Sequence, residues 1–125
     1  MEKFLVSACL LGINCRYDGK NAHREKVIKL LKNKCVIFAC PEQLGGLTTP
    51  RPKNKIARGV VINESGVDVT EEFHRGAAEF LKIANIFGVK KLILKSKSPS
   101  CGKNGMVTKL LPKGFEVQYE VQYIK

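Results

Sequence analysis

The sequence predicts an α/β protein, a single three-layer α/β/α domain over residues 1–125 with a mostly parallel, Rossmann-like sheet and a small hairpin insertion. The chain has 125 residues, a length typical of one compact domain. Apolar segments of strand length alternate with amphipathic segments of helix length, which is the order of βαβ units. The strand segments are apolar at successive positions, as expected for strands that are covered on both faces.

A first strand–helix–strand unit is predicted near the N-terminus. Lys3–Ala8 is a short apolar run, and polar and glycine residues after it indicate a loop. His23–Asn33 carries its apolar side chains on one helical face and lysines elsewhere, which predicts an amphipathic helix. Cys35–Ala39 is a second buried strand, and it must end at Pro41 because proline cannot continue a central strand.

The middle of the chain is predicted to be a long loop, a hairpin and a helix. Residues 41–58 are rich in proline and glycine, and loops longer than about 12 residues are often functional. Val60–Asn63 and Val67–Val69 are expected to pair as a hairpin. Thr70 is a suitable N-cap for the helix that follows, and Gly88 is a suitable residue to end it.

The last third predicts a strand at Lys91–Leu94, a polar loop at Ser96–Gly105, a short helix at Val107–Leu111 and a final strand at Phe115–Tyr123. The formal charge of +11 favours anionic partners such as phosphates or nucleic acid. No apolar run reaches the roughly 18 residues that cross a membrane, and the apolar segment near Met1 is too short for a secretion signal. We therefore expect a cytoplasmic protein whose thiols stay reduced.

Three cysteines follow predicted strands. Cys9, Cys40 and Cys101 each lie just past the carboxyl end of a strand, so a parallel sheet brings them to the same edge. Three thiolates without a fourth suit an iron–sulfur cluster with one open iron. The alternative is that Cys9 and Cys40 are small apolar residues at strand ends. Cys35 lies inside a strand as a core thiol, while Cys15 can be a fourth ligand, a redox partner or a spectator.

Polar residues near these cysteines are candidates for binding and proton transfer. Glu42 follows Cys40 by two residues, which suits a proton-transfer carboxylate, although a solvated loop residue is the alternative. The basic and hydroxyl side chains of the two long loops can hold an anionic or carbonyl-bearing substrate. These are Arg51, Arg58, Lys95, Ser96, Lys97, Ser98, Ser100 and Lys103.

Three motifs in order resemble a known family. The motifs are Ser7–Gly12 with Arg16–Gly19, then Cys40–Glu42 with Leu44–Leu47 and Thr49–Pro52, then Leu94–Ser96 with Ser98–Gly102. Together they are similar to the bacterial domain of unknown function 523, whose characterised branch is the thiouracil desulfurase (TudS) group. The link from Gly102 to Gly105 is shorter than is usual in that family, which removes a loop beside the expected cluster.

The resemblance implies a [4Fe–4S] cluster held by Cys9, Cys40 and Cys101, and replacement of the sulfur of a thiolated pyrimidine base or nucleoside by oxygen from water. Glu42 is then the acid–base group, and Ser98 or Ser100 helps to position substrate or water. Arg51, Lys95 and Lys97 are the expected substrate-binding cations, and tRNA is a further expected contact of the basic surface.

Two other functions remain open from the sequence. One is a non-catalytic basic module that binds RNA or carries metal or sulfur, which the positive charge favours although no RNP-like aromatic motif is present. The other is a thiol redox protein that uses Cys9 and Cys15, although this pair lacks Cys-x-x-Cys spacing.

Overall fold

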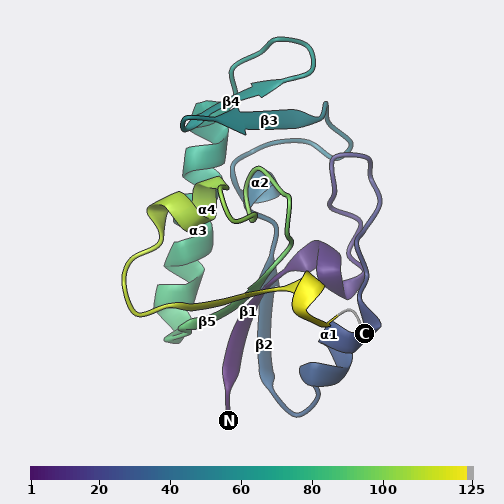
Figure 1. Cartoon of the computed structure of the whole chain (residues 1–125), viewed down its shortest axis with the longest axis vertical. Helices are drawn as coiled ribbons and strands as arrows, with labels where there is room; N and C mark the ends of the chain where they lie inside the picture. The colour runs from purple at the N-terminus through teal and green to yellow at the C-terminus, as the bar shows by residue number, and fades with distance from the viewer. Residues whose placement is uncertain (124–125) are drawn as a thin grey trace.

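A computed structural model describes residues 1–123 and has at its centre a four-stranded parallel sheet in the order β2–β1–β5–β6 (Figure 1). The predicted α/β class with a mostly parallel sheet is confirmed. β1 and β5 are neighbours in the sheet, but the chain after β1 continues to β2 on one side and the chain after β5 continues to β6 on the other. In parallel sheets, ligands bind at the carboxyl ends of two such strands, so the crevice there is the expected ligand site. The strands are β1 (Lys3–Ser7), β2 (Cys35–Ala39), β5 (Lys91–Leu94) and β6 (Glu116–Tyr119).

Helices cover both faces of this sheet. α1 (Glu25–Leu30) and the 3₁₀ turn η2 (Glu120–Tyr123) lie on one face, and α3 (Thr70–Phe87) and α4 (Met106–Leu110) lie on the other (Figure 1). Alternating side chains of β1 explain this arrangement, because Leu5 packs into the core beneath α3 whereas its neighbours Phe4 and Val6 pack into the core beneath α1. Both cores are apolar, which explains the continuous apolar sequence of the central strands β1 and β5.

Two of the predicted elements are shorter than expected. The helix expected over His23–Asn33 covers only Glu25–Leu30. The strand expected over Phe115–Tyr123 ends at Tyr119 and continues as η2, so this prediction is wrong beyond Tyr119. The physical reason for the second difference is Glu120, whose buried carboxylate binds the backbone and hydroxyl of Ser96 instead of facing solvent from a strand.

The predicted hairpin exists with different strands. β3 (Asn54–Ala57) pairs with β4 (Val60–Asn63), and the two-residue turn between them has positive φ angles at Arg58 and Gly59, as a tight hairpin requires. The predicted pairing of Val60–Asn63 with Val67–Val69 is confirmed only in part, because Val67–Val69 does not form a strand. An isolated antiparallel bridge joins Ile62 to Asp68, and backbone N–H groups of Asn63 and Val69 donate to the carbonyls of Val67 and Val61, both over 2.9 Å. The hairpin lies beyond the carboxyl ends of the sheet strands (Figure 1).

The long loop predicted over residues 41–58 contains regular structure. It begins with the short helix α2 (Pro41–Leu44) and ends in β3. The 3₁₀ turn η1 (Ala8–Leu11) follows β1 in the same way that α2 follows β2. Gly88 ends α3 with a φ of 65°, as predicted, whereas Thr70 is the first residue of that helix and its hydroxyl binds Val61 instead of acting as an N-cap.

Candidate active site

A pocket of about 150 Å³ lies at the carboxyl ends of β1, β2 and β5. Its walls come from η1 and the loop after it, from the start of α2, from the segment before β3 and from the loop after β5. It gathers residues that are far apart in the sequence, as expected where parallel strands end at one edge. The chemically active side chains that line it are Ser7, Cys9, Cys15, Arg16, Tyr17, Cys40, Glu42, Arg51, Lys53, Lys95, Lys97, Ser98, Ser100 and Cys101.

The structure brings the three strand-end cysteines into this pocket. Cys9 lies in η1, Cys40 directly precedes α2, and Cys101 lies in the loop after β5. Cys101 is buried, whereas Cys9 and Cys40 are half-buried. Cys35 is half-buried at the opposite end of the sheet, where it pairs with Lys3, and it does not line the pocket.

Cys15 is a fourth thiol in the same pocket. It is 1% exposed, and its thiol is within hydrogen-bonding contact of the thiols of Cys40 and Cys9. The thiol of Cys40 also donates to the Cys15 carbonyl over 3.7 Å. Of the three roles that the sequence left open for Cys15, a spectator role away from the site does not agree with this position.

The local environment raises the pKa of Cys15, Cys40 and Cys101. Burial raises the pKa of Cys101 to about 12, although hydrogen bonds from Ser7 and Ser100 lower it. The hydrogen bond with Cys15, together with burial, raises the pKa of Cys40 strongly. The contact with Cys40 lowers the pKa of Cys15, but the contact with Cys9 and burial outweigh it, so this pKa rises to about 11. Metal binding must therefore release protons from the site.

Glu42 is the buried carboxylate of the pocket. Its Oε1 accepts a hydrogen bond from Arg51 Nε over 2.9 Å, and its Oε2 accepts one from Ser100 Oγ over 2.9 Å. Ser98 Oγ lies 3.0 Å from Ser100 Oγ. The hydroxyl of Ser100 has one proton, and Glu42 Oε2 at 2.9 Å is a much closer acceptor than Cys101 Sγ at 3.8 Å. Ser98 then donates to Ser100, so the protons are ordered from Ser98 to Ser100 to Glu42.

The loop after β5 places these serines. Ser98 Oγ accepts the backbone N–H groups of Ser100 and Cys101 over 3.2 Å and 3.1 Å, which fixes its position beside Cys101. Ser98 is half-buried and Ser100 is buried, so both hydroxyls face the protein more than the solvent. After Gly102 the short link leads almost directly into α4.

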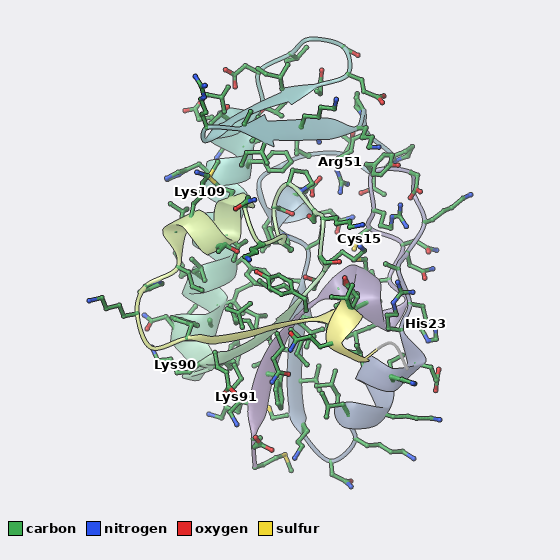
Figure 2. The ribbon with its side chains drawn as sticks, viewed as in Figure 1. Cys15, His23, Arg51, Lys90, Lys91 and Lys109 are labelled. Atoms are coloured by element: carbon green, nitrogen blue, oxygen red, sulfur yellow. The ribbon has the colours of Figure 1, made fainter. Side chains whose placement is uncertain are left out.

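Arg51 lies with its guanidinium inside the protein. Besides Glu42, it donates to the Thr48 carbonyl over 3.1 Å, to Thr49 Oγ1 over 2.9 Å and to the Cys15 carbonyl over 2.9 Å. The side chain of Arg51 points toward the Cys15 loop (Figure 2). Four of its five N–H groups are thus used by the protein itself, so the substrate-binding role predicted for Arg51 has little free hydrogen-bonding capacity to support it.

The two predicted lysines differ in their surroundings. Lys95 Nζ donates to the Ser96 carbonyl over 2.8 Å and lies 3.8 Å from Glu120, whereas Lys97 is exposed at the pocket rim with a φ of 56°. Arg58 and Lys103, which were also candidates, do not line the pocket. Arg16 and Lys53 do, and both cations stack near the ring of Tyr17.

Ser7 and Glu120 are buried polar residues to which the sequence assigned no role, and the same holds for Arg16, Tyr17 and Lys53 in the pocket lining. Ser7 accepts the Lys95 N–H over 3.0 Å and hydrogen-bonds the thiol of Cys101, so it joins the ends of β1 and β5. Glu120 is fully buried and holds the start of the loop after β5. Ser7 could have been recognised as a site residue from the sequence, because it is a polar residue at the end of an apolar strand. Glu120 gave no such signal, because it lay inside a predicted strand.

The thiols of the pocket are arranged for a metal cluster and not for a single ion. Among residues 1–123, no group of three His, Cys, Asp or Glu side chains is arranged to hold a single metal ion. An iron–sulfur cluster takes its thiolates at separate irons, so it needs soft ligands spread around a cavity and not converging on one point. Cysteines on three different walls of one pocket fit that requirement.

Comparison with known proteins agrees with this geometry. The sequence model of a family described as 2-thiouracil desulfurase matches residues 4–119. The chain belongs to the 2-thiouracil desulfurase family. A further family relative is an uncharacterized protein, YbbK of Bacillus subtilis (strain 168), which is 44% identical over 108 residues, or 78% of this chain and 72% of the relative.

A solved structure is similar to this member of the 2-thiouracil desulfurase family over nearly its whole length. It is described as the [4Fe-4S]-dependent thiouracil desulfidase TudS (DUF523Vcz), with a TM-score of 0.89, 38% sequence identity, and coverage of 98% of this chain and 93% of the other. In residues 1–123, no helix is long and apolar enough to cross a membrane.

Proposed function

We propose that the chain is a [4Fe–4S]-dependent desulfurase that replaces the sulfur of a thiolated pyrimidine by an oxygen of water. The observation that carries this proposal is the meeting of Cys9, Cys40 and Cys101 in one pocket beside the buried Glu42. Family membership and the similarity to TudS support the same activity. When bound, the cluster would supply an iron that takes a thiocarbonyl sulfur and acts as a Lewis acid.

Glu42 is the group that would accept the proton of the attacking water. A carboxylate has about four lone-pair positions, and Arg51 and Ser100 use one each, so Glu42 can bind a water as well. Ser100 and Ser98 orient this carboxylate from the side of Cys101. Proton transfer by a positioned group of this kind contributes roughly 10²–10⁴-fold to a rate.

The pocket rim suits an anionic or polar heterocycle. Lys97, Lys53 and Arg16 present cations there, and Tyr17 adds an aromatic face. A thiolated pyrimidine or its nucleoside is therefore the proposed substrate. Contact with tRNA stays a prediction that rests on the net charge alone. The cytoplasmic location stays a prediction that rests on the short apolar segment near Met1.

Anaerobic reconstitution with iron and sulfide tests the proposal. About four irons per chain and release of sulfide from 2-thiouracil or 4-thiouridine are expected for the wild-type protein. Cys9→Ala, Cys40→Ala and Cys101→Ala should each lose iron. Cys35→Ala is the matched control, because it removes a thiol at the far end of the sheet and should keep full iron content.

Glu42→Gln separates the catalytic proposal from the metal-binding one. This variant should keep its iron and lose activity by about 10²–10⁴-fold, because the amide cannot accept a proton. Undiminished activity in Glu42→Gln would remove Glu42 from the proposal. A wild-type protein that binds zinc or no metal under these conditions would instead favour the non-catalytic binding module.

A further inference from the structure

Glu120 is a fully buried carboxylate that lies behind the pocket wall. It belongs to η2, the turn that follows the last strand of the sheet, and it does not line the pocket. The ammonium of Lys95 lies 3.8 Å from its Oε1. Burying a carboxylate costs free energy unless hydrogen bonds and a cation compensate it. The partners of Glu120 therefore indicate what the residue does.

The hydrogen bonds of Glu120 go to the residue where the loop after β5 begins. Oε1 and Oε2 accept the Ser96 N–H over 2.7 Å and 2.9 Å, and Oε1 also accepts the Ser96 hydroxyl. The preceding residue, Lys95, donates its N–H to Ser7 Oγ over 3.0 Å. Side chains from β1 and from the segment after β6, the two neighbours of β5, thus hold two successive amides at this point.

The turn that follows Ser96 is closed on itself. Gly102 donates its N–H to the Ser98 carbonyl over 2.8 Å, and a Cβ atom on Gly102 would lie 2.6 Å from that oxygen. Ser98 Oγ in turn accepts the N–H groups of Ser100 and Cys101. A shift at Ser96 therefore moves the turn as a unit, because close packing leaves no space to absorb the shift inside it.

The far end of the turn is attached in a different way. Met106 and Val107, at the start of α4, donate their N–H groups to the carbonyls of Pro99 and Ser100 over 3.0 Å and 2.9 Å. Because α4 packs on α3, this attachment belongs to the protein core. The near end depends instead on polar side chains, and Glu120 supplies most of their hydrogen bonds.

We propose that Glu120 is a positioning residue for the desulfuration reaction, which holds Ser96 so that Ser98 and Ser100 keep Glu42 oriented toward the attacking water. This proposal rests on the proposed function. Glu120 acts through the loop and does not contact the substrate, so its removal should slow turnover without weakening substrate binding.

The first test is kinetic and compares Glu120→Gln with Glu116→Gln. Glutamine keeps the size of the side chain but replaces one accepting oxygen by an NH₂ donor. The kcat of sulfide release per bound cluster should fall by about ten- to hundredfold in Glu120→Gln, with an unchanged KM for 2-thiouracil. Glu116 is an exposed carboxylate of β6, so Glu116→Gln should behave as wild type. A raised KM with unchanged kcat in Glu120→Gln would overturn the positioning role.

A double-mutant cycle tests whether Glu120 acts through the serines. Glu120→Gln combined with Ser98→Ala should be about as active as the less active single variant, because both changes remove the same arrangement. Losses that multiply would show that Glu120 acts independently of Ser98 and would overturn the proposal. Ser96→Ala removes only the hydroxyl contact with Glu120 and should lower kcat in the same direction by less. This milder variant completes the same cycle with Ser98→Ala if Glu120→Gln does not fold.

Hydrogen exchange of the protein without iron gives a measurement that does not depend on the cluster. The amides of residues 96–102 should exchange several-fold faster in Glu120→Gln than in wild type or Glu116→Gln, whereas the amides of β1 should keep their wild-type rates. Equal exchange in the loop would overturn the proposal and leave the desulfurase activity intact. Absence of iron and of sulfide release from every protein, wild type included, would instead reject the proposed function, and the exchange rates would still show whether Glu120 holds the loop.

Discussion

Arg51 is the residue that connects the acid–base side of the pocket to the thiol side. Its guanidinium binds Glu42 through Nε and the Cys15 carbonyl through Nη2, both over 2.9 Å. A guanidinium can form these bonds at once because its donors are held in one plane and point in different directions. A lysine ammonium at this position cannot reach both partners. We therefore expect Arg51 to act mainly by positioning Glu42 and the Cys15 loop, since four of its five N–H groups are bound within the protein.

Arg51→Lys should lower kcat on the order of hundredfold and leave KM nearly unchanged, because a small displacement of a catalytic group has an effect of that size. Iron content should stay at the wild-type level, since none of the cysteine ligands is removed. Steady-state kinetics of sulfide release, with iron counted in the same samples, checks both expectations.

Arg58→Lys is the control, because Arg58 lies in the exposed hairpin turn outside the pocket. A rise in KM with unchanged kcat in Arg51→Lys would instead return Arg51 to the substrate-binding role that the sequence suggested.

The sequence predicted the positions of the site residues that follow strands, but not of those that lie in loops. Cys9, Cys40 and Cys101 follow buried strands, and parallel strands bring their carboxyl ends together whatever the loops do. Cys15 lies in a loop after η1, so its position depends on tertiary contacts to Arg51 and Cys40 that no periodicity reveals. The inward direction of the Arg51 side chain has the same origin.

At the scale of elements, α2 and α3 touch through their backbones. A Cβ atom on Gly76 would lie 1.8 Å from the Pro41 carbonyl oxygen, and one on Gly45 would lie 2.0 Å from the Glu72 carbonyl oxygen. Both neighbours are backbone atoms, so neither can rotate away. This close approach sets the position of α2, which carries Glu42 and directly follows Cys40.

Gly76→Ala should destabilise the protein by about 1–3 kcal/mol or more, because overpacking must push α2 away from α3. Helix propensity alone would give the opposite sign, a stabilisation of about 1 kcal/mol. Urea unfolding therefore decides between the two effects. A variant that is more stable than wild type would contradict the backbone contact.

Glu2 joins the starts of two strand segments. It accepts hydrogen bonds from Lys34, over 2.6 Å, and from Lys91, and these bonds lower its pKa from 4.5 to about 2. A lowered carboxyl pKa adds stability above pH 4.5 that is lost as the pH falls toward 2. Wild-type protein should therefore lose more stability than Glu2→Gln between about pH 5 and about pH 2.5.

Urea titrations at several pH values measure this difference, and they should show a small effect because both ion pairs are exposed to solvent. Parallel stability curves for the two proteins would rule out the contribution of Glu2.

Sequence patterns predicted the sheet strands well because burial on both faces leaves a continuous apolar run. They failed to find β3, because Asn54–Ala57 alternates between covered and exposed residues and carries no such run. They also failed after Tyr119, where a single buried contact of Glu120 turns the chain into η2. The local sequence pattern therefore predicts the elements that bury apolar surface. The structure of the other segments depends on polar contacts between distant residues, which the pattern does not reveal.

For the whole molecule, the proposed cluster ligands come from three separate parts of the chain. Metal binding would therefore hold these parts together in the folded state. A group that binds only the folded state stabilises it by mass action. Reconstituted protein should therefore unfold at a higher temperature than protein without iron. Each of Cys9→Ala, Cys40→Ala and Cys101→Ala should abolish that difference in an anaerobic thermal scan, whereas Cys35→Ala should retain it. Equal melting temperatures with and without iron would show that iron does not bind the folded state preferentially.

The positions of the strands in the sheet predict which of the proposed ligands is released most easily. Cys9 and Cys101 follow β1 and β5, which are paired on both sides, whereas Cys40 follows the edge strand β2. Edge strands open before central ones, and Phe38 of β2 is already half exposed. Amide hydrogens of β2 should thus exchange before those of β1. Loss of the metal group would then begin at Cys40, and a partner that delivers or removes it would meet this edge of the protein first.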